Sequence, residues 1–415
     1  MIKSVTGTKD ILPAEIPKWK FLEQVIEKIF TSFNYKEIRT PAFEETSLFA
    51  RGIGEETDIV GKEMYTFLDK SKTSLTLKPE MTASVVRAYV QHSLGKQQGL
   101  NKLYYISSMF RQERPQAGRL REFHQFGAEA LGSSSPLLDV EMILMSFEIL
   151  KNLGLKNISV RINSLGIPES REKYKSILKD YLSDKKNKLS EDSRKRLETN
   201  ILRIFDSKDE ADQKIMKNAP SIMDYLDLVS KKDFEIVKEN LSGLEMPFEV
   251  DPKLVRGLDY YTKTTFEIIS GNVGSQSALV GGGRYDLLVE HLEGGPTPGI
   301  GFAAGMDRIL LACENENVLN LSQEQISLYI VRIDENLLND VFKIASDFRR
   351  QNVSVEIDYL NRSVKAQMRE ANKLNARSVL FVGGDEYKSG QYKLKNMESG
   401  EEKLIPIDKL NEINL

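Results

Sequence analysis

The 415-residue sequence contains very little cysteine and histidine. Its single cysteine, Cys313, excludes an internal disulfide and a metal cluster held by several thiolates. The three histidines, His92, His124 and His291, form no HExxH motif or comparable pair of ligands. We therefore expect a cytoplasmic protein that holds no structural metal.

Long apolar runs and an excess of one charge are also lacking. The longest apolar runs, such as 143–145 and 309–313, are far too short to span a bilayer. The N-terminal MIKSVTGTKD lacks the basic-then-apolar layout of a signal peptide. The 58 basic and 61 acidic residues leave a net charge of −3, so no global positive field attracts nucleic acid. Any contact with nucleic acid must come from local clusters, and we expect no membrane partner.

What is present is the composition of an ordinary globular protein, 40% hydrophobic and 29% charged. A chain of 415 residues is too long for one core, which predicts two or three domains. Residues 19–33 have the spacing of an amphipathic helix, and 78–92 also favour a helix. Short extended segments are expected at 35–41, 75–77, 103–107 and 123–131. Short strands without regular βαβ alternation predict an α+β domain on an antiparallel sheet.

The composition changes near residue 168 and again at 315–325. Residues 168–243 are highly charged and helical in pattern, which predicts a helical insertion inside a first domain at 1–320. We interpret its charges as solvated helix faces. Beyond 325, strands at 327–333, 353–359 and 378–382 alternate with helices at 335–352 and 364–375, followed by a hairpin at 391–395 and 403–407. This predicts a separate α/β domain at 326–415 with a partly parallel sheet.

The strongest local signal is MFRQERPQAGRLREFHQFGAE at 109–129. It carries arginines at 111, 114, 119 and 121, between two strand-like segments. Such a hairpin presents guanidinium groups to a polyanion, and Phe123 offers a ring on which a base can stack. The alternative is an exposed loop whose charges are merely solvated. Four arginines within eleven residues favour the anion-binding interpretation.

Two glycine-rich runs follow, VGGGRYD at 280–286 and GIGFAAGMDR at 299–308. The second contains G-x-G-x-x-A, which is found in dinucleotide-binding turns. We reject that interpretation because the preceding HLEGGPTP is not a buried strand and no βαβ unit surrounds it. The glycines are instead expected to allow close backbone packing around a ligand.

Five stretches together resemble class II aminoacyl-tRNA synthetases, and in detail the histidyl-tRNA synthetase family. They are TGTKD at 6–10, RTP at 39–41, FRQERP at 110–115 with EFHQFG at 122–127, GIGF through DR at 299–308, and the pair LVRGLDYY at 254–261 and GGGRY at 281–285. The resemblance covers nearly the whole chain. It implies a class II antiparallel-sheet catalytic domain with a helical insertion, followed by an α/β anticodon-binding domain.

The resemblance implies that histidine is activated with ATP and Mg²⁺ and then transferred to the 3′ end of tRNA(His). It assigns Arg111 and Arg256 to the α-phosphate and Arg308 to the γ-phosphate, as the catalytic cations. Glu113 and Phe123 would hold the adenine. Chemistry at phosphorus depends mostly on positioning and charge neutralisation, which these side chains supply. Mg²⁺ would be held by the ATP phosphates and water.

The resemblance also implies a histidine site. Its residues would be Glu80, Thr82 and Gln125 near the ammonium group, Glu129, Tyr261 and Tyr285 near the imidazole, and Arg256. A carboxylate that faces one ring nitrogen favours imidazole, because an apolar competitor would leave that buried carboxylate unpaired. For each of these polar positions, the alternative is a satisfied structural role.

Macromolecular partners follow from the same resemblance. The loop at 112–119 would enter the tRNA acceptor end, with Gln116 and Arg119 as candidate contacts, and the insertion would touch the acceptor arm. The helix at 19–33 and the strand at Pro41 would form a homodimer interface, unless that helix only packs in its own core. Candidate anticodon contacts are Arg349, Arg350, Arg362 and Lys365. Lys78 stands where many relatives have arginine, which keeps the charge without the bidentate fork.

Two alternative functions stay open at this point. One is a regulatory subunit of ATP phosphoribosyltransferase, a synthetase-like protein that senses histidine without charging tRNA. Such a protein is expected to lack the C-terminal domain and to have eroded motifs. In this sequence the C-terminal α/β segment is present, and so are Arg111, Glu113, Arg256 and Arg308 of the motifs. The other is an RNA-binding adaptor without enzymatic activity, which would produce no pyrophosphate exchange with ATP and histidine.

Overall fold

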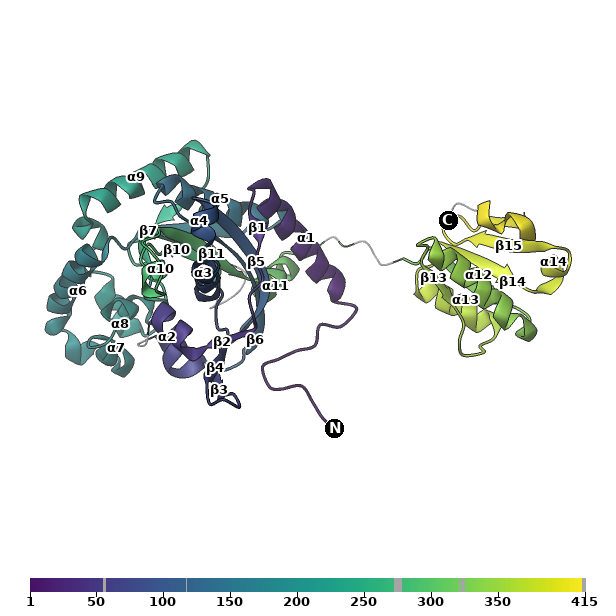
Figure 1. Ribbon diagram of the computed structural model, residues 1–415, viewed down its shortest axis with the longest axis horizontal. Coiled ribbons are helices and arrows are strands. Elements are labelled where there is room, and N and C mark those ends of the chain that lie inside the picture. Colours follow the sequence, from purple (N-terminus) through teal and green to yellow (C-terminus); the bar gives the residue numbers. More distant parts are fainter. Residues whose placement is uncertain (55–56, 117, 272–277, 320, 322–324, 413–415) are drawn as a thin grey trace. The chain divides into compact units, whose positions relative to one another are not determined.

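The computed structural model describes residues 1–54, 57–116, 118–271, 278–319, 321 and 325–412. It divides into two compact units, Met1–Asn320 and Leu321–Leu415 (Figure 1). Parts of the expected boundary at 315–325 and Ala117 of the arginine-rich loop lie outside the described residues. Both units combine helices with β-sheet.

The first unit is built on an eight-stranded sheet with the order β1-β5-β6-β11-β10-β9-β7-β8. Its strands are β1 (Lys36–Glu37), β5 (Asn101–Phe110), β6 (Glu122–Leu131), β7 (Ile158–Ser164), β8 (Glu249–Val250), β9 (Thr262–Ser270), β10 (Ala278–Arg284) and β11 (Gly299–Gly305). Only the outer pairs β1–β5 and β7–β8 are parallel. The pairs between them are antiparallel, which confirms the predicted fold class.

The main core of this unit lies between the sheet and the helices α1 (Ile16–Ser32), α5 (Pro136–Asn152) and α11 (Met306–Asn315). The apolar residues of α1 at helical spacing, Trp19, Leu22, Ile26 and Phe30, are buried in this core. The apolar face of α1 therefore packs within its own unit.

A second, smaller sheet and several short helices complete the described part of the first unit outside the insertion. A three-stranded sheet has the order β2-β4-β3, with β2 (Phe43–Glu45), β3 (Tyr65–Leu68) and β4 (Ser74–Leu77). The remaining helices are α2 (Thr46–Ile53), α3 (Thr82–Gln91), α4 (Leu94–Gln97), α10 (Leu288–His291) and a π-helix at Ile59–Glu63. The helix expected at 78–92 begins later, at Thr82, because Pro79 and the segment before it are not helical.

The two glycine-rich runs contribute to central strands, β10 and β11, that were not predicted from the sequence. A Cβ at Gly282 would lie 2.6 Å from the carbonyl oxygen of Gly301, and one at Gly301 would lie 1.7 Å from a carboxylate oxygen of Glu129. Glycine is therefore required here by close approach, although it generally weakens strands. Because β11 runs antiparallel to both of its neighbours, it belongs to no βαβ unit.

A helical insertion runs from Pro168 to Gly243 between β7 and β8. It contains α6 (Pro168–Ser183), α7 (Glu191–Arg196), α8 (Glu210–Met216) and α9 (Leu228–Gly243), with 3-10 turns at Lys186–Lys188, Ile201–Asp206 and Ile222–Tyr225. These helices gather beside the β7 edge of the sheet, in teal in Figure 1. Their apolar core includes Tyr174 and Leu178 and continues into Tyr260, Tyr261 and Tyr285, which lie next to β9 and β10. The insertion and the tyrosines therefore share one core.

The second unit is a five-stranded sheet with the order β13-β12-β14-β15-β16. Its elements are β12 (Leu328–Arg332), a 3-10 turn at Glu335–Leu337, α12 (Leu338–Arg350), β13 (Val355–Ile357), α13 (Val364–Lys373), β14 (Ser378–Val382), α14 (Gly384–Lys388), β15 (Gln391–Asn396), β16 (Glu402–Pro406) and a 3-10 turn at Ile407–Glu412. β12 is parallel to β13 and β14, and β15 and β16 form an antiparallel hairpin. This arrangement confirms the prediction of an α/β domain with a partly parallel sheet.

The buried face of α12 does not include all of its apolar residues. Val341, Ala345 and Phe348 are buried, but Leu338 and Phe342 are 42% and 52% exposed. At 3.6 residues per turn, Phe342 lies about 100° around the helix from Val341, outside the stripe that faces the sheet.

Candidate active site

A cavity of about 200 Å³ lies on the sheet face opposite the main core. Successive residues of a strand point to opposite faces, so Phe126 and Phe302 enter the core while Gln125 and Ala303 line the cavity. Most of the candidate residues line it: Glu80, Thr82, Arg111, Glu113, Arg119, Phe123, Gln125, Arg256, Tyr261 and Arg308. Glu129, Tyr285 and Gln116 are not among the lining residues.

Two of the three expected catalytic arginines are held at the cavity by backbone carbonyls. Arg111 directly follows β5, and its Nε donates to the carbonyl of Pro79 at 2.9 Å. Arg308 lies in the first turn of α11 and donates to the carbonyls of Gly118 at 2.9 Å and Ala278 at 3.1 Å. Burial and the nearby charge of Arg119 lower the pKa of Arg308. This concentration of positive charge is suited to an anion.

Arg256 lies in the loop between β8 and β9. It forms an ion pair with Glu267 of β9, and its guanidinium lies 5.6 Å from the ring centroid of Tyr261. Burial alone would lower the pKa of Arg256, but the Glu267 carboxylate raises it. A Cβ at Gly281 would lie 2.1 Å from Nη2 of Arg256. The guanidinium therefore rests against β10 at a place where only glycine leaves room.

Glu113 and Arg119 face each other across the arginine-rich loop. Glu113 is buried, and its carboxylate lies 2.5 Å from Nε of Arg119. The backbones of Gln116 and Arg119 pair with each other at 3.0 and 2.9 Å, which closes the tip of the loop. Gln116 lines a separate groove with Lys62 and other residues of this loop. Arg119 and Glu113 border both the cavity and this groove.

Glu129 is fully buried on β6 and lies behind the cavity wall. It accepts hydrogen bonds from the hydroxyls of Thr82 at 2.8 Å and Tyr285 at 2.5 Å. Burial raises the pKa of Glu129 from 4.5 to about 8. Because Thr82 lines the cavity, it connects the cavity to this carboxylate.

Glu80 and Gln125 differ in the hydrogen bonds that the described residues make to their side-chain oxygens. The Glu80 carboxylate accepts from the backbone N–H groups of Thr82 at 2.7 Å and Ala83 at 2.9 Å, so it caps the start of α3. Burial raises the pKa of Glu80. Oε1 of Gln125 is buried and has no hydrogen-bond partner in the described part of the chain. Gln125 therefore offers an open acceptor at the cavity.

A polar group formed by Asp307, His124 and Lys9 was not predicted from the sequence. The Asp307 carboxylate accepts from the backbone N–H of His124 at 3.0 Å and lies 3.3 Å from Nζ of Lys9. Burial opposes the charge, yet the hydrogen bonds from His124 hold the pKa of Asp307 below its usual value. Each residue belongs to a motif quoted above, so the motifs themselves were the available signal. Their contacts bring the N-terminal TGTKD segment to the cavity.

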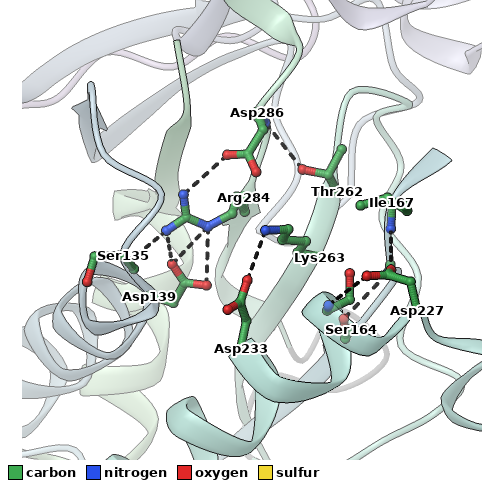
Figure 2. Close-up of polar contacts among 12 residues, drawn as sticks. Ser135, Asp139, Ser164, Ile167, Asp227, Asp233, Thr262, Lys263, Arg284 and Asp286 are labelled. Atoms are coloured by element: carbon green, nitrogen blue, oxygen red, sulfur yellow. Dashed lines mark hydrogen bonds and ion pairs between the residues drawn. The ribbon is translucent and has the colours of Figure 1, made fainter. Parts of the chain in front are cut away.

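Arg284, directly before Tyr285, is the largest fully buried side chain of the described residues. Figure 2 shows its guanidinium between Asp139 and Asp286. Nε donates to Asp139 at 3.0 Å, Nη1 to the Ser133 carbonyl at 3.1 Å and to Asp286 at 3.2 Å, and Nη2 to the Ser135 carbonyl at 3.0 Å and to Asp139. All five N–H donors are thus used. Arg284 fixes the end of β10, and with it Tyr285, to the start of α5.

Two kinds of feature are absent from the part of the chain that the structure describes. No three His, Cys, Asp or Glu side chains are grouped so that they could hold a metal ion. No helix there is long and apolar enough to cross a membrane.

Lys78, which stands where many relatives have arginine, does not line the cavity. Its Nζ lies 3.5 Å from the carbonyl of Thr40, and burial lowers its pKa.

Comparison with known proteins covers both units. A family model described as Histidyl-tRNA synthetase matches residues 7–309, and an anticodon binding domain model matches residues 319–413. Proteins named Histidine--tRNA ligase from Halothermothrix orenii and Caldanaerobacter subterraneus subsp. tengcongensis are 47% and 46% identical, over 99% of this chain and 98% of each relative. The crystal structure of apo S. aureus histidyl-tRNA synthetase has a TM-score of 0.83 and 38% identity, and covers 99% of both chains.

Proposed function

The chain belongs to the histidyl-tRNA synthetase family, and on this premise we propose that the cavity around Arg111, Arg256 and Arg308 activates histidine with ATP. The full-length relatives make it an aminoacyl-tRNA synthetase, a histidine–tRNA ligase that uses ATP. The regulatory-subunit alternative is not favoured. A structure described as an ATP phosphoribosyltransferase regulatory subunit/histidyl-tRNA synthetase from Bacillus halodurans C is 21% identical, with a TM-score of 0.65, and that likeness concerns the fold alone.

The observation that carries the proposal is the convergence of three guanidinium groups on one cavity. A carboxylate oxygen of histidine attacks the α-phosphorus of ATP, the bond from that phosphorus to the bridging oxygen breaks, and pyrophosphate leaves. Arg111 contacts the carboxylate and the α-phosphate, Arg256 the α-phosphate and Arg308 the γ-phosphate. The carboxylate is already ionised at neutral pH, so the step requires no general base. Fixed cations stabilise the charge that builds at phosphorus.

ATP enters as its Mg²⁺ complex in this proposal. The metal is held by the phosphates and water, since such ions usually keep several waters and bind through substrate phosphates. Phe123 presents a ring for the adenine, and Glu113 presents a carboxylate to its amino group. Arg119 now occupies the side of Glu113 at 2.5 Å, so the adenine amino group would compete with it for this carboxylate.

Histidine lies deeper in the cavity. Its ammonium group is placed at the open oxygen of Gln125 and beside Glu80, whose carboxylate also caps α3. Its imidazole is directed to Glu129, with Tyr261 and Tyr285 around it and Thr82 at the cavity wall. A competitor without a ring N–H would make no hydrogen bond to Glu129, which would keep only those from Thr82 and Tyr285, and this disfavours its binding relative to histidine.

The groove beside Gln116 and Arg119 is our proposed contact with the tRNA acceptor end, and the insertion is placed against the acceptor arm. The second unit, which matches the anticodon-binding model, binds the anticodon. Three of its four candidate contacts already have internal partners: Arg349 donates to the Val355 carbonyl, Arg362 pairs with an aspartate and a glutamate, and Arg350 pairs with Asp347 at 3.0 Å. The Arg350 side chain is nevertheless 79% exposed, against 36% for Arg349 and 29% for Arg362. We therefore favour Arg350 and Lys365 for direct contact and assign Arg349 and Arg362 to shaping the surface.

We also propose a cytoplasmic homodimer. Because the apolar face of α1 packs in its own core, the exposed polar face of that helix is the part offered to the interface. Beyond Pro41, the exposed rings of Phe43 and Phe67 lie 6.4 Å apart on the three-stranded sheet. An open groove of about 900 Å³ next to Pro41 offers further surface. Exposed apolar patches of this kind mark interaction sites.

ATP–pyrophosphate exchange tests the proposed site. The full-length protein should exchange pyrophosphate with histidine and with no other standard amino acid. Arg308→Ala should reduce the exchange rate by about 10²–10³-fold, the loss typical of removing one fixed donor. Arg350→Ala, which removes an exposed arginine of the second unit, is the control and should leave exchange unchanged. Exchange that does not depend on Arg308 would contradict the assignment of the cavity.

A further inference from the structure

The helical insertion contacts the segment after Arg256 at three separate points. The contacts are Nδ2 of Asn200 to Oδ1 of Asp259 at 2.9 Å, Nη1 of Arg171 to the carbonyl oxygen of Tyr261 at 2.5 Å, and Nζ of Lys263 to Oδ2 of Asp233 at 2.9 Å. Each contact comes from a different part of the insertion: Arg171 from α6, Asn200 from the position before the 3-10 turn Ile201–Asp206, and Asp233 from α9. Figure 2 shows the Lys263–Asp233 contact. The insertion therefore holds alternate residues of one short segment.

This segment leads from the loop of Arg256 into β9 and carries Tyr261 into the cavity. At its end, Lys263 adopts a φ of +44°, a left-handed conformation that is strained for a residue with a side chain. Two backbone hydrogen bonds keep it there, from Lys263 N to the Gly166 carbonyl at 2.9 Å and from Leu165 N to the Lys263 carbonyl at 2.7 Å. Such a backbone persists only where its surroundings constrain it, and here both the β7–α6 turn and α9 do so.

Apolar packing between the insertion and this segment is incomplete. Beside the shared core, a second cavity of about 160 Å³ is lined by Arg171 and Asn200 of the insertion and by Val255, Arg256 and Asp259 on the other side. At this cavity the polar contacts of Arg171 and Asn200 add to the packing in holding the segment. Burial lowers the pKa of Arg171, as expected for a guanidinium withdrawn from water. A hydrogen bond in such a place is costly to leave unmade.

We propose that the insertion is a positioning device for histidine activation, in which Arg171 and Asn200 hold the segment that orients Tyr261 and Arg256. This rests on the proposed function, which places Tyr261 beside the imidazole and Arg256 at the α-phosphate. Arg171 and Asn200 are positioning residues, since they reach the reactants through Tyr261 and Asp259. The insertion then acts in the first step of the reaction, before any tRNA is bound.

The test is single-turnover formation of histidyl-adenylate by the full-length protein without tRNA. Arg171→Met should lower the rate about tenfold or more, because displacement of reacting groups by about 1 Å can cost 10²-fold. Histidine affinity should fall with it, whereas ATP affinity should stay within about twofold. Arg171→Lys should recover part of the rate, since an ammonium still donates to the Tyr261 carbonyl. Asn200→Ala should show a smaller loss of the same kind.

Arg196→Met is the matched control. Nη1 of Arg196 donates to the carbonyl of Arg203 at 3.0 Å inside the insertion, the same kind of contact without reaching the segment. An equal loss in Arg196→Met would assign the effect to general stability of the insertion and overturn the proposal. So would folded Arg171→Met and Asn200→Ala proteins with normal rate and histidine affinity. If Arg171→Met does not fold, Asn200→Ala and Arg171→Lys decide. A wild-type protein that forms no adenylate would instead contradict the proposed function.

Discussion

At the scale of single residues, Gly281 controls where the Arg256 guanidinium can lie. A Cβ at this position would come within 2.1 and 2.5 Å of the two terminal nitrogens of Arg256. The end of a flexible side chain moves more easily than a central strand, so Gly281→Ala should displace Arg256 and leave the fold intact. We expect the rate of adenylate formation to fall about 10- to 100-fold, part of the loss typical of removing a fixed donor.

Single-turnover kinetics with thermal unfolding as a companion checks this prediction. Gly243→Ala is the control, because a Cβ there meets nothing within 4 Å. A Gly281→Ala protein with the wild-type rate would show that the contact with Gly281 does not place Arg256.

Because of Glu129, the stability of the folded protein should decrease as the pH rises through about 8. Its pKa is about 8 in the folded chain, raised from 4.5 by burial. The folded state therefore holds this proton more tightly, and that contribution to stability is complete below pH 4.5 and is lost as the pH rises through about 8. Glu129→Gln removes the titration but keeps most of the shape.

The measurement is the difference in melting temperature between wild type and Glu129→Gln at several pH values without ligand. The difference should shift in favour of the variant as the pH rises from 5 to 8. Glu80 also has a raised pKa and is present in both proteins, and its charge is one cause of the raised pKa of Glu129, so Glu80→Gln should reduce the pH dependence of the difference. A difference independent of pH would show that Glu129 does not titrate in this range.

At the scale of elements, the junction between β10 and α5 depends on the buried pair of Arg284 and Asp139. Breaking a buried ion pair by removing one partner typically costs about 3–5 kcal/mol, because the other charge stays buried and unpaired. Arg284→Met should therefore lower the unfolding free energy of the first unit by about this amount, and should weaken histidine binding through Tyr285.

Denaturant unfolding and histidine titration test this pair. The double variant Arg284→Met with Asp139→Leu should recover part of the stability, since the fully buried carboxylate is removed and the remaining partner, Asp286, is partly exposed. Equal stability of Arg284→Met and wild type would mean that the junction is held by its apolar neighbours instead.

The same scale shows what could be predicted from sequence. The helix α1 was predictable because Trp19, Leu22, Ile26 and Phe30 repeat at helical spacing, and β14 because a continuous apolar run ends at two glycines. The strands β10 and β11 were not, because their glycines are set by contacts with Glu129 and neighbouring backbone that no local pattern reveals.

The candidate site divides in the same way. The arginines at 111, 256 and 308 stand in recognisable motifs, and the structure brings them to one cavity. The position of Glu129 behind the cavity wall, the pairing of Glu113 with Arg119 and the contacts of Arg171 with the Tyr261 carbonyl depend on long-range packing. Spacing along the chain carries no information on such contacts, so the sequence alone could not predict them.

At the scale of the whole molecule, the two compact units predict a separation of activities. The cavity residues all lie within the first unit. A protein ending near Ser322 should retain much of the histidine-dependent pyrophosphate exchange and lose most of the tRNA charging. Unchanged charging by the truncated form would show that the second unit does not bind tRNA. A folded truncated form without exchange would show that the second unit supports the catalytic one.

The central claim is that fixed cations at the cavity stabilise the transition state of adenylate formation. Single-turnover kinetics of Arg256→Ala, with histidine and ATP affinities measured separately, test it most directly. The rate of the chemical step should fall about 10²–10³-fold, or roughly 3–4 kcal/mol, with a much smaller change in histidine affinity. Arg256→Lys should recover only part, because one ammonium does not reproduce a planar fork. A near-normal chemical step with poor histidine binding would contradict the account and leave Arg256 as a brace for Tyr261.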